Sequence, residues 1–263
     1  MRRSIRRLIE YLSRGRVLKR RLPEDLGGAS IFVTPDAALK LWGHDLRRFD
    51  PALLDAAAEL VFPGAQVWDL GANVGLFAFA SAFLAGEKGG VRAVEPDPFL
   101  ASLLRRSAAS QPAGRAPVEV IEAAATATAG TVEFQIAERG RAANHLATVE
   151  GSSQAGGVRT TRKVTAVTLD GLLETGPAPD VLKIDVEGAE MLALGGATRL
   201  LSETRPRIFC EVTAENSGPA GALFASFGYE VFDASVPAAE RSPLESAPWN
   251  TFAVPRPPEH GRA

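Results

Sequence analysis

The chain has 263 residues, of which 46% are hydrophobic and 23% are charged, and its formal net charge at neutral pH is −2. This composition is that of a folded globular protein and excludes an intrinsically disordered chain. The length fits one α/β domain with an N-terminal extension, and it argues against two full domains.

The first 21 residues are strongly basic, with nine Arg or Lys side chains against Glu10 as the single acid. The remainder holds 20 basic and 30 acidic side chains, a net of −10. Apolar residues recur at helical spacing among the arginines, and they are Ile5, Leu8, Ile9 and Leu12. This pattern predicts a basic amphipathic helix over about 2–14. Three interpretations stay open: packing on the body, binding to a membrane surface or anionic partner, and an organelle presequence.

Further along the chain, two short strands are expected at 29–34 and 38–42, and a helix over 51–62 ends at Pro63-Gly64. Strands then alternate with helices. The core strands are expected at 66–70, 90–94, 118–121, 181–184 and 207–212, and the helices at 75–84, 98–110, 169–173, 189–201 and 219–227. Two more strands, 130–135 and 159–167, flank a Gly-rich loop at 151–157, and 230–233 with 250–254 forms a closing pair. The alternation predicts a doubly wound, mostly parallel sheet with helices on both faces.

The single cysteine, Cys210, excludes an internal disulfide and a cysteine-based structural zinc site. It lies in the apolar run 207–212, where we expect it to be a small buried hydrophobic residue. No apolar run approaches the roughly 20 residues that span a bilayer, and the N-terminus lacks the apolar core of a secretory signal. We therefore expect a cytoplasmic protein.

The segment 67–80 joins a strand, an acid, a glycine loop and an apolar helix start. A dinucleotide fingerprint has glycine at three places, which here hold Gly71, Asn73 and Leu76, so a pyrophosphate is poorly accommodated. Asp69 would repel a phosphate but suits an ammonium group. Glu95 closes the next strand at roughly the 20-residue offset of a carboxylate that binds ribose. Together these features favour S-adenosylmethionine, which carries an ammonium and a ribose but no phosphate.

A second constellation lies in the segment 181–190, which contains Lys183, Asp185, Glu187 and Glu190. Ligands of open α/β sheets bind beyond the carboxyl ends of the strands, where Asp185 and Glu187 are expected. Acids in a first helical turn also stabilise the helix dipole, so a purely structural role is an alternative. Lys183 falls inside a buried strand and needs a carboxylate partner there.

These blocks together resemble the FkbM-type methyltransferases, S-adenosylmethionine-dependent enzymes with the seven-stranded class I methyltransferase sheet. The resemblance spans residues 62–255 and rests on four blocks in order: 62–75, 94–97, 182–190 and 249–255. The basic arm and the tail are not covered by the resemblance. We expect a basic N-terminal helix and short strands packed on the core (1–50), a methyltransferase domain (51–255) and a flexible tail (256–263).

The resemblance also implies the donor site. It places Asp69, Gly71, Asn73 and Gly75 around the methionine part of S-adenosylmethionine, with Glu95 on its ribose. The adenine is expected near Pro96, with Glu122 or Thr126 as a weakly supported polar partner. Asp185 is placed at the mouth of the methyl-acceptor pocket.

A hydroxyl acceptor must also lose its proton, and Asp185, Glu187 and His145 are the candidate catalytic bases. Asn144 beside His145 is a candidate for orienting the substrate. A divalent metal held by Asp185 and Glu211, with or without Glu187, is a further alternative that we do not favour.

The sequence thus predicts O-methylation of a hydroxyl on a small natural product, sugar or glycan. The Asp-Val-Glu-Gly run at 185–188 disfavours methylation of nucleobase amines, and Cys210, inside a strand, disfavours a cysteine nucleophile. The alternatives are a catalytically silent cofactor-binding protein and, less favoured, a nicotinamide-dependent oxidoreductase. The acceptor itself stays open, because acceptor specificity is expected in loops such as 135–162.

Overall fold

The protein is described here from a computed structural model that covers residues 2–149 and 156–257. Most of the expected Gly-rich loop at 151–157 and most of the expected tail at 256–263 lie outside these residues. The helices are α1 (Arg2–Ser13), α2 (Pro51–Leu60), α3 (Leu76–Ala85), α4 (Pro98–Ala108), α5 (Leu169–Leu173), α6 (Glu190–Gly195) and α7 (Ser217–Ser226). In the described part of the chain, no helix combines the length and the apolar composition needed to cross a bilayer.

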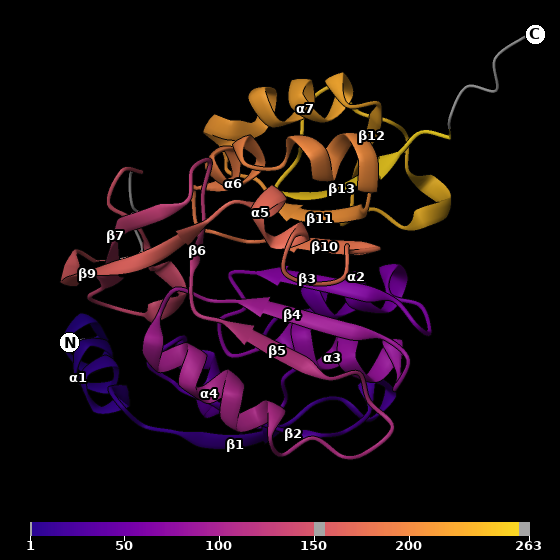
Figure 1. Cartoon of the computed structure of the whole chain (residues 1–263). Helices are drawn as coiled ribbons and strands as arrows, with labels where there is room; N and C mark the ends of the chain where they lie inside the picture. Colours follow the sequence, from indigo (N-terminus) through magenta and orange to yellow (C-terminus); the bar gives the residue numbers. More distant parts are fainter. Residues whose placement is uncertain (1, 150–155, 258–263) are drawn as a thin grey trace, which may run out of the picture.

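A seven-stranded sheet forms the centre of the molecule, with the order β12-β13-β11-β10-β3-β4-β5 (Figure 1). Its strands are β3 (Gln66–Leu70), β4 (Gly90–Val94), β5 (Val118–Ile121), β10 (Val181–Ile184), β11 (Arg207–Glu211), β12 (Tyr229–Asp233) and β13 (Asn250–Pro255). The pairs from β11 to β5 are parallel, whereas β13 runs antiparallel to both β11 and β12. The predicted large, mostly parallel α/β sheet is therefore present.

Each face of this sheet has its own apolar core. Val67 of β3 packs in a cluster with Leu54 of α2 and Phe77 of α3, whereas the next residue, Trp68, packs with Leu194 of α6. Successive side chains of a strand point to opposite faces, so one strand supplies both clusters. Its near-continuous apolar sequence is what a strand covered on both faces requires.

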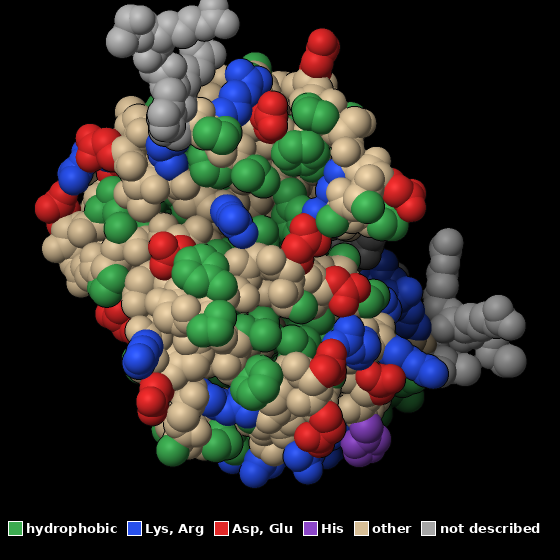
Figure 2. Space-filling model, turned by 90° about the vertical axis from the view of Figure 1, so that its right-hand side faces the viewer, with side chains coloured by type: hydrophobic (Ala, Val, Ile, Leu, Met, Phe, Trp, Pro, Cys, Tyr) green, Lys and Arg blue, Asp and Glu red, His purple; other side chains and the backbone are tan. Residues whose placement is uncertain are grey.

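Two smaller sheets complete the fold. The first pairs β1 (Leu18–Arg21) with β2 (Ser30–Val33). The second has the order β6-β9-β7-β8, with β6 (Ala124–Ala125), β7 (Gly130–Ala137), β8 (His145–Leu146) and β9 (Val158–Val167). Figure 1 shows β7 and β9 on the side of the molecule where the central strands end. Figure 2 shows the opposite side, where acidic, basic and hydrophobic side chains are interspersed.

Two of the expected elements need correction. The strand expected at 38–42 is instead the 3-10 helix η2 (Leu39–Trp42), and the Arg20 guanidinium donates to the Leu41, Trp42 and Gly43 carbonyls there. The helix expected at 189–201 is interrupted after α6, and a π-helical segment follows over Leu200–Thr204. The interruption has a physical cause, because the Asp170 carboxylate accepts the Arg199 and Leu200 backbone N–H groups and begins a new helical segment.

Lys183 has the carboxylate partner that its burial demands. Its Nζ lies 3.0 Å from Asp69 Oδ1 on the neighbouring strand and 3.6 Å from Asp185 Oδ2. The same ammonium donates to the carbonyls of Leu70 and Gly71 at 3.2 and 2.7 Å. Lys183 and Asp69 are directly opposite each other in the β10–β3 register. The pair therefore links the two central strands at the point where the glycine loop begins.

Replacing Lys183 with Met should destabilise the protein strongly, because it leaves Asp69 buried without a countercharge. We expect the free energy of unfolding, measured with denaturant, to fall by about 3–5 kcal/mol. Lys163→Met on the exposed part of β9 is the matched control and should change stability by less than about 0.5 kcal/mol. The double variant Asp69→Leu/Lys183→Met should recover part of the loss, and equal stability of the single variant and the wild type would contradict this account.

Candidate functional site

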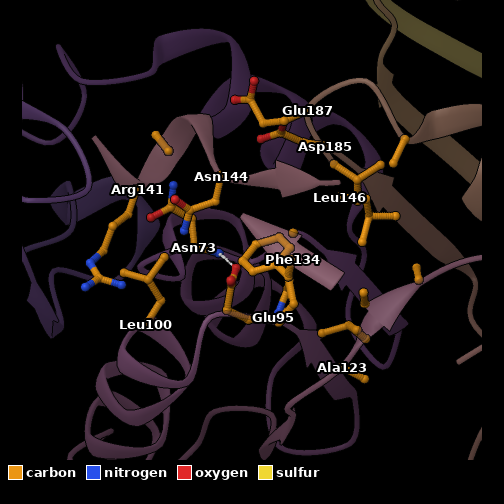
Figure 3. A pocket seen from close by; sticks show the side chains of 18 residues that line it. Asn73, Glu95, Leu100, Ala123, Phe134, Arg141, Asn144, Leu146, Asp185 and Glu187 are labelled. Carbon is orange, nitrogen blue, oxygen red and sulfur yellow. Dashed lines mark hydrogen bonds between the residues drawn. The ribbon is translucent and has the colours of Figure 1, made fainter. Parts of the chain in front are cut away.

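A cavity lies at the carboxyl ends of β3, β4 and β10, with about 580 Å³ of empty space including its open mouth. Several of the residues predicted from the sequence line this one cavity, and they are Gly71, Asn73, Glu95, Pro96, Asn144, Asp185 and Glu187. Figure 3 shows Asp185 and Glu187 at the top of the cavity, Arg141 at its left, and Phe134 and Glu95 below the two carboxylates. The predicted ligand site is thus assembled from segments more than 100 residues apart.

The glycine loop is shaped by close backbone contacts. Gly71 has a φ of +68°, and its N–H and that of Ala72 both donate to the Val94 carbonyl at 2.9 and 3.1 Å. A Cβ on Gly71 would lie only 1.8 Å from the Asp185 carbonyl oxygen. Asn73 occupies the second glycine position of the fingerprint with a φ of +52°, a conformation that asparagine tolerates.

Glu95 is buried beneath this loop and holds it in place. Its Oε2 accepts the Asn73 N–H at 2.8 Å and its Oε1 accepts the Asp97 N–H at 2.9 Å (Figure 3). Each carboxylate oxygen has a second lone pair, and the side chain lines the cavity, so it can also accept two hydroxyl groups. Burial raises the pKa of Glu95 to about 7, against the opposing effect of the two backbone N–H groups.

Two residues expected at the cofactor do not line the cavity. Asp69 is fully buried against Lys183, so it bears on the cavity through that ammonium and the loop carbonyls it holds. Gly75 has a φ of +88°, and a Cβ there would overlap Phe79 and Leu104. Its absent side chain therefore allows α3 and α4 to pack closely. The expected direct contacts of Asp69 and Gly75 with a ligand need correction to supporting roles.

Asp185 and Glu187 line the cavity and form an acidic cluster with Glu211. Burial, together with the Asp185 and Glu211 charges, raises the pKa of Glu187, and burial with the Asp185 charge raises that of Glu211. Lys183 is the cation among them, and although its burial opposes a charge, Asp69 and Asp185 raise its pKa. Such a cluster is suited to a cationic ligand, because each positive group relieves repulsion among the carboxylates.

Glu190 belongs to the scaffold. Its Oε1 accepts the Gly188 N–H at 2.8 Å and its Oε2 accepts the Asn216 side-chain amide at 2.7 Å, so it fixes the start of α6. Glu187, just before, has a φ of +48°. Within residues 2–149 and 156–257, no group of three or more His, Cys, Asp or Glu side chains is arranged to hold a metal ion.

His145 is placed differently from the sequence prediction. It is buried in β8 with its Nδ1 3.1 Å from the Ala143 carbonyl oxygen, and it does not line the cavity, whereas its neighbours Asn144 and Leu146 do. Because successive residues of a strand alternate in direction, a cavity-facing Leu146 turns His145 away. His145 as a general base therefore needs correction.

The cavity wall formed by Arg141 and Asn144 contains a buried charge network that sequence reasoning missed. The Arg141 guanidinium donates to Asp36 Oδ2 at 2.8 Å and also to Asp97 Oδ2. Arg159 makes two hydrogen bonds to the Asp36 carboxylate, at 2.8 and 2.9 Å, and the Asn144 amide donates to Asp97 Oδ2 at 2.9 Å. The network joins the N-terminal segment around Asp36, the loop after β4 and the β7–β9 sheet into one wall. The separations of 44 to 123 residues explain why no local sequence signal marks it.

The segment after β5 contributes small apolar residues. Ala123, Ala124 and Ala125 line the cavity, whereas the expected polar partners face elsewhere. Glu122 pairs with Arg105 at 2.8 Å, and the Thr126 hydroxyl donates to the Thr128 carbonyl at 2.8 Å. A flat apolar ring is the kind of group that three adjacent alanines and Pro96 accommodate.

The fold and cavity define a class I α/β protein with a site for a nucleoside-like ligand: a mostly parallel sheet, a glycine loop at its carboxyl edge and a buried carboxylate one strand away. The Methyltransferase FkbM domain matches residues 69–231, which is more than half of the chain. The chain therefore belongs to the FkbM methyltransferase family. This assignment gives no support to the nicotinamide alternative.

Similar proteins include the hexuronic acid methyltransferase AglP of Haloferax volcanii, which is 28% identical over 137 residues, or 51% of each chain. A solved FkbM methyltransferase from Methylobacillus flagellatus has 15% identity and a TM-score of 0.44 over 76% of this chain and 50% of that one. An O-methyltransferase from Thermotoga maritima has 12% identity and a TM-score of 0.42 over 80% and 67%. The chain spans about half the length of the Haloferax and Methylobacillus proteins.

The Gly71→Ala variant should be much less stable than Gly64→Ala. Both glycines have a positive φ, but a Cβ on Gly64 meets nothing within 4 Å, so that variant reports the backbone cost alone, about 1–2 kcal/mol. Gly71→Ala adds the collision with the Asp185 carbonyl and should lose clearly more free energy of unfolding in denaturant titrations. Equal losses in the two variants would contradict the close approach of the loop to β10.

Proposed function

We propose that this chain transfers the methyl group of S-adenosylmethionine to a hydroxyl oxygen of a sugar, whether free, in a small natural product or in a glycan. The proposal is carried by Asp185 and Glu187, two carboxyl groups that line the cavity beyond the end of β10. A hydroxyl loses its proton as it is methylated, and the raised pKa of Glu187 makes that side chain a better base than an ordinary carboxylate. Asp185 is then suited to orienting the hydroxyl and to stabilising the positive donor.

The residues present fit the donor. Gly71 and Asn73 would surround its methionine part, Glu95 would accept its ribose hydroxyls, and Pro96 with the alanines at 123–125 would hold its adenine. The Asn73 side-chain oxygen is buried without a hydrogen-bond partner, which makes it a ready acceptor for an ammonium. Once bound, S-adenosylmethionine supplies an electrophilic methyl group on a sulfonium, and the chain itself aligns the acceptor and excludes water.

A sugar acceptor is supported by the Haloferax volcanii relative, whose name specifies a hexuronic acid. A hexuronic acid offers both hydroxyl and carboxylate oxygens. The acidic cluster of Asp185, Glu187 and Glu211, of which the first two line the cavity, disfavours a second anion beside it. We therefore propose a hydroxyl as the acceptor, which gives a methyl ether in place of a methyl ester.

The acceptor is tested by incubating the enzyme with methyl-labelled S-adenosylmethionine and matched sugars, methyl glucoside and methyl glucuronide. Mass spectrometry should find labelled sugar whose methyl group resists mild alkali, as an ether does. Label released by alkali would identify an ester and contradict the hydroxyl acceptor. If labelled methyl groups are found neither in these two sugars nor in longer glycans, a sugar as the methyl acceptor is contradicted.

The Glu187→Gln variant should lose about 10²–10⁴-fold in kcat on an accepted sugar, because the base is replaced by a group that cannot take the proton. Its Kd for S-adenosylmethionine, measured by calorimetry, should stay within about threefold of the wild type. Glu215→Gln, at an exposed acid in the 3-10 helix after β11, is the matched control and should keep its kcat. Full activity of Glu187→Gln would exclude this residue as the base.

Donor binding should weaken as the pH falls from 8 to 6. Glu95 has a pKa of about 7, and hydroxyl donors favour its ionised form, so protonation competes with binding below pH 7. We expect the Kd to rise by up to about tenfold over this range. Glu95→Gln should bind S-adenosylmethionine more weakly and lose this pH dependence. Glu122→Gln should keep the wild-type affinity and the wild-type pH dependence. A wild-type Kd that is flat across the range would contradict the role of Glu95.

A further inference from the structure

The helix α1 differs in charge from the rest of the protein. Its sequence, RRSIRRLIEYLS, contains four arginines and one acid, and five more basic residues follow by position 21. The remainder of the chain has a net charge of −10. The basic segment is thus concentrated in one element and is not part of a generally cationic surface.

Four apolar side chains of this helix are exposed large hydrophobic residues. Leu8, Ile9, Tyr11 and Leu12 are 58%, 39%, 65% and 49% exposed. By contrast, Ser13 is fully buried and Glu10 is 8% exposed, so a polar side of the helix faces the protein. This arrangement is the reverse of the usual surface helix, which buries its apolar stripe.

Polar contacts hold α1 in this orientation. Ser13 Oγ accepts a hydrogen bond from Trp42 Nε1 at 3.1 Å and donates to the Ile9 carbonyl at 2.7 Å. Glu10 lies 2.9 Å from Arg6 and 3.6 Å from Arg139. Arg14, directly after the helix, pairs with Glu138. The apolar residues are therefore turned outward by specific contacts on the other side of the helix.

The helix also lies at the functional end of the molecule. Its partners Glu138 and Arg139 precede Arg141, which lines the cavity. Figure 1 shows α1 beside β7 and β9, on the side where the central strands end. The opposite side, in Figure 2, has acidic and basic side chains interspersed.

From the exposed apolar residues and the charge of this segment, we propose that α1 is a docking surface for an anionic lipid membrane. An in-plane amphipathic helix buries leucine and aromatic side chains at the headgroup boundary, while its arginines pair with anionic lipids. The apolar residues favour lipid over nucleic acid, which a basic stripe alone would serve. The concentrated positive charge favours lipid over a second copy, because two such helices would repel each other. This surface does not depend on the identity of the methyl acceptor.

The test uses the full chain with sedimented vesicles of phosphatidylcholine, with and without phosphatidylglycerol. The wild type should bind the anionic vesicles at least about tenfold more tightly than the neutral ones, and salt should weaken the binding. The affinity of Leu8→Ser/Leu12→Ser for anionic vesicles should be about tenfold or more weaker, since the variant lacks two apolar side chains that the bilayer would bury. Leu244→Ser, at a leucine that is 42% exposed outside α1, should bind as the wild type does.

Several outcomes would overturn the proposal. They are wild-type levels of binding by the leucine double variant, equal binding to neutral and anionic vesicles, and no binding to either. Tight binding of polyuridylate that the leucine variant retains would assign α1 to nucleic acid. A dimer in light scattering that the leucine variant dissociates would assign it to a second copy. An unchanged Kd for S-adenosylmethionine in the double variant confirms that the body is folded, so that lost vesicle binding is attributed to α1.

Discussion

The ammonium of Lys183 is the interaction on which the site depends. It is buried in β10, and it binds the Asp69 carboxylate of the neighbouring strand β3. It also donates to the carbonyls of Leu70 and Gly71, where β3 ends and the glycine loop begins. A buried charge of this kind is stable only when each of its donors is paired. The glycine loop therefore takes its position from β10 as well as from β3, and Asp185, directly after β10, is brought to the loop's edge.

The single ammonium of Lys183 cannot neutralise Asp69, Asp185, Glu187 and Glu211 together. Burial and the remaining repulsion among these carboxylates raise the pKa of Glu187 and of Glu211. Glu187 and Glu211 hold protons more tightly than free carboxyl groups because burial and neighbouring negative charge both disfavour ionisation. A ligand that carries positive charge relieves this repulsion, whereas an anion increases it. Under the proposed function, the same cluster favours a sulfonium donor and leaves a carboxyl group able to take up a proton.

Local patterns predicted the central strands and the glycine loop of this protein well. The four strands at 66–70, 90–94, 118–121 and 181–184 agree with the structure to the residue, because each is a short apolar run bounded by turn residues. Gly71, Asn73 and Glu95 were identifiable because a ligand loop and its carboxylate lie on consecutive strands. His145 was misjudged because a two-residue strand has no readable alternation, and Asp69 because its partner Lys183 lies 114 residues away.

The other side of the cavity, which we propose as the acceptor side, depends on contacts between distant segments, and its sequence is therefore hard to interpret. Its wall depends on Arg141 and Arg159, whose charges are matched by Asp36 and Asp97 on other parts of the chain. Removing one member would leave the others buried without partners, so the network is sensitive as a unit while each residue alone looks like an ordinary surface charge. Under the proposed function, donor recognition depends on contiguous motifs, whereas acceptor recognition depends on pairings that exist only in the folded chain. A change of acceptor within such a fold therefore requires coordinated changes in several segments, and the donor loop can stay as it is.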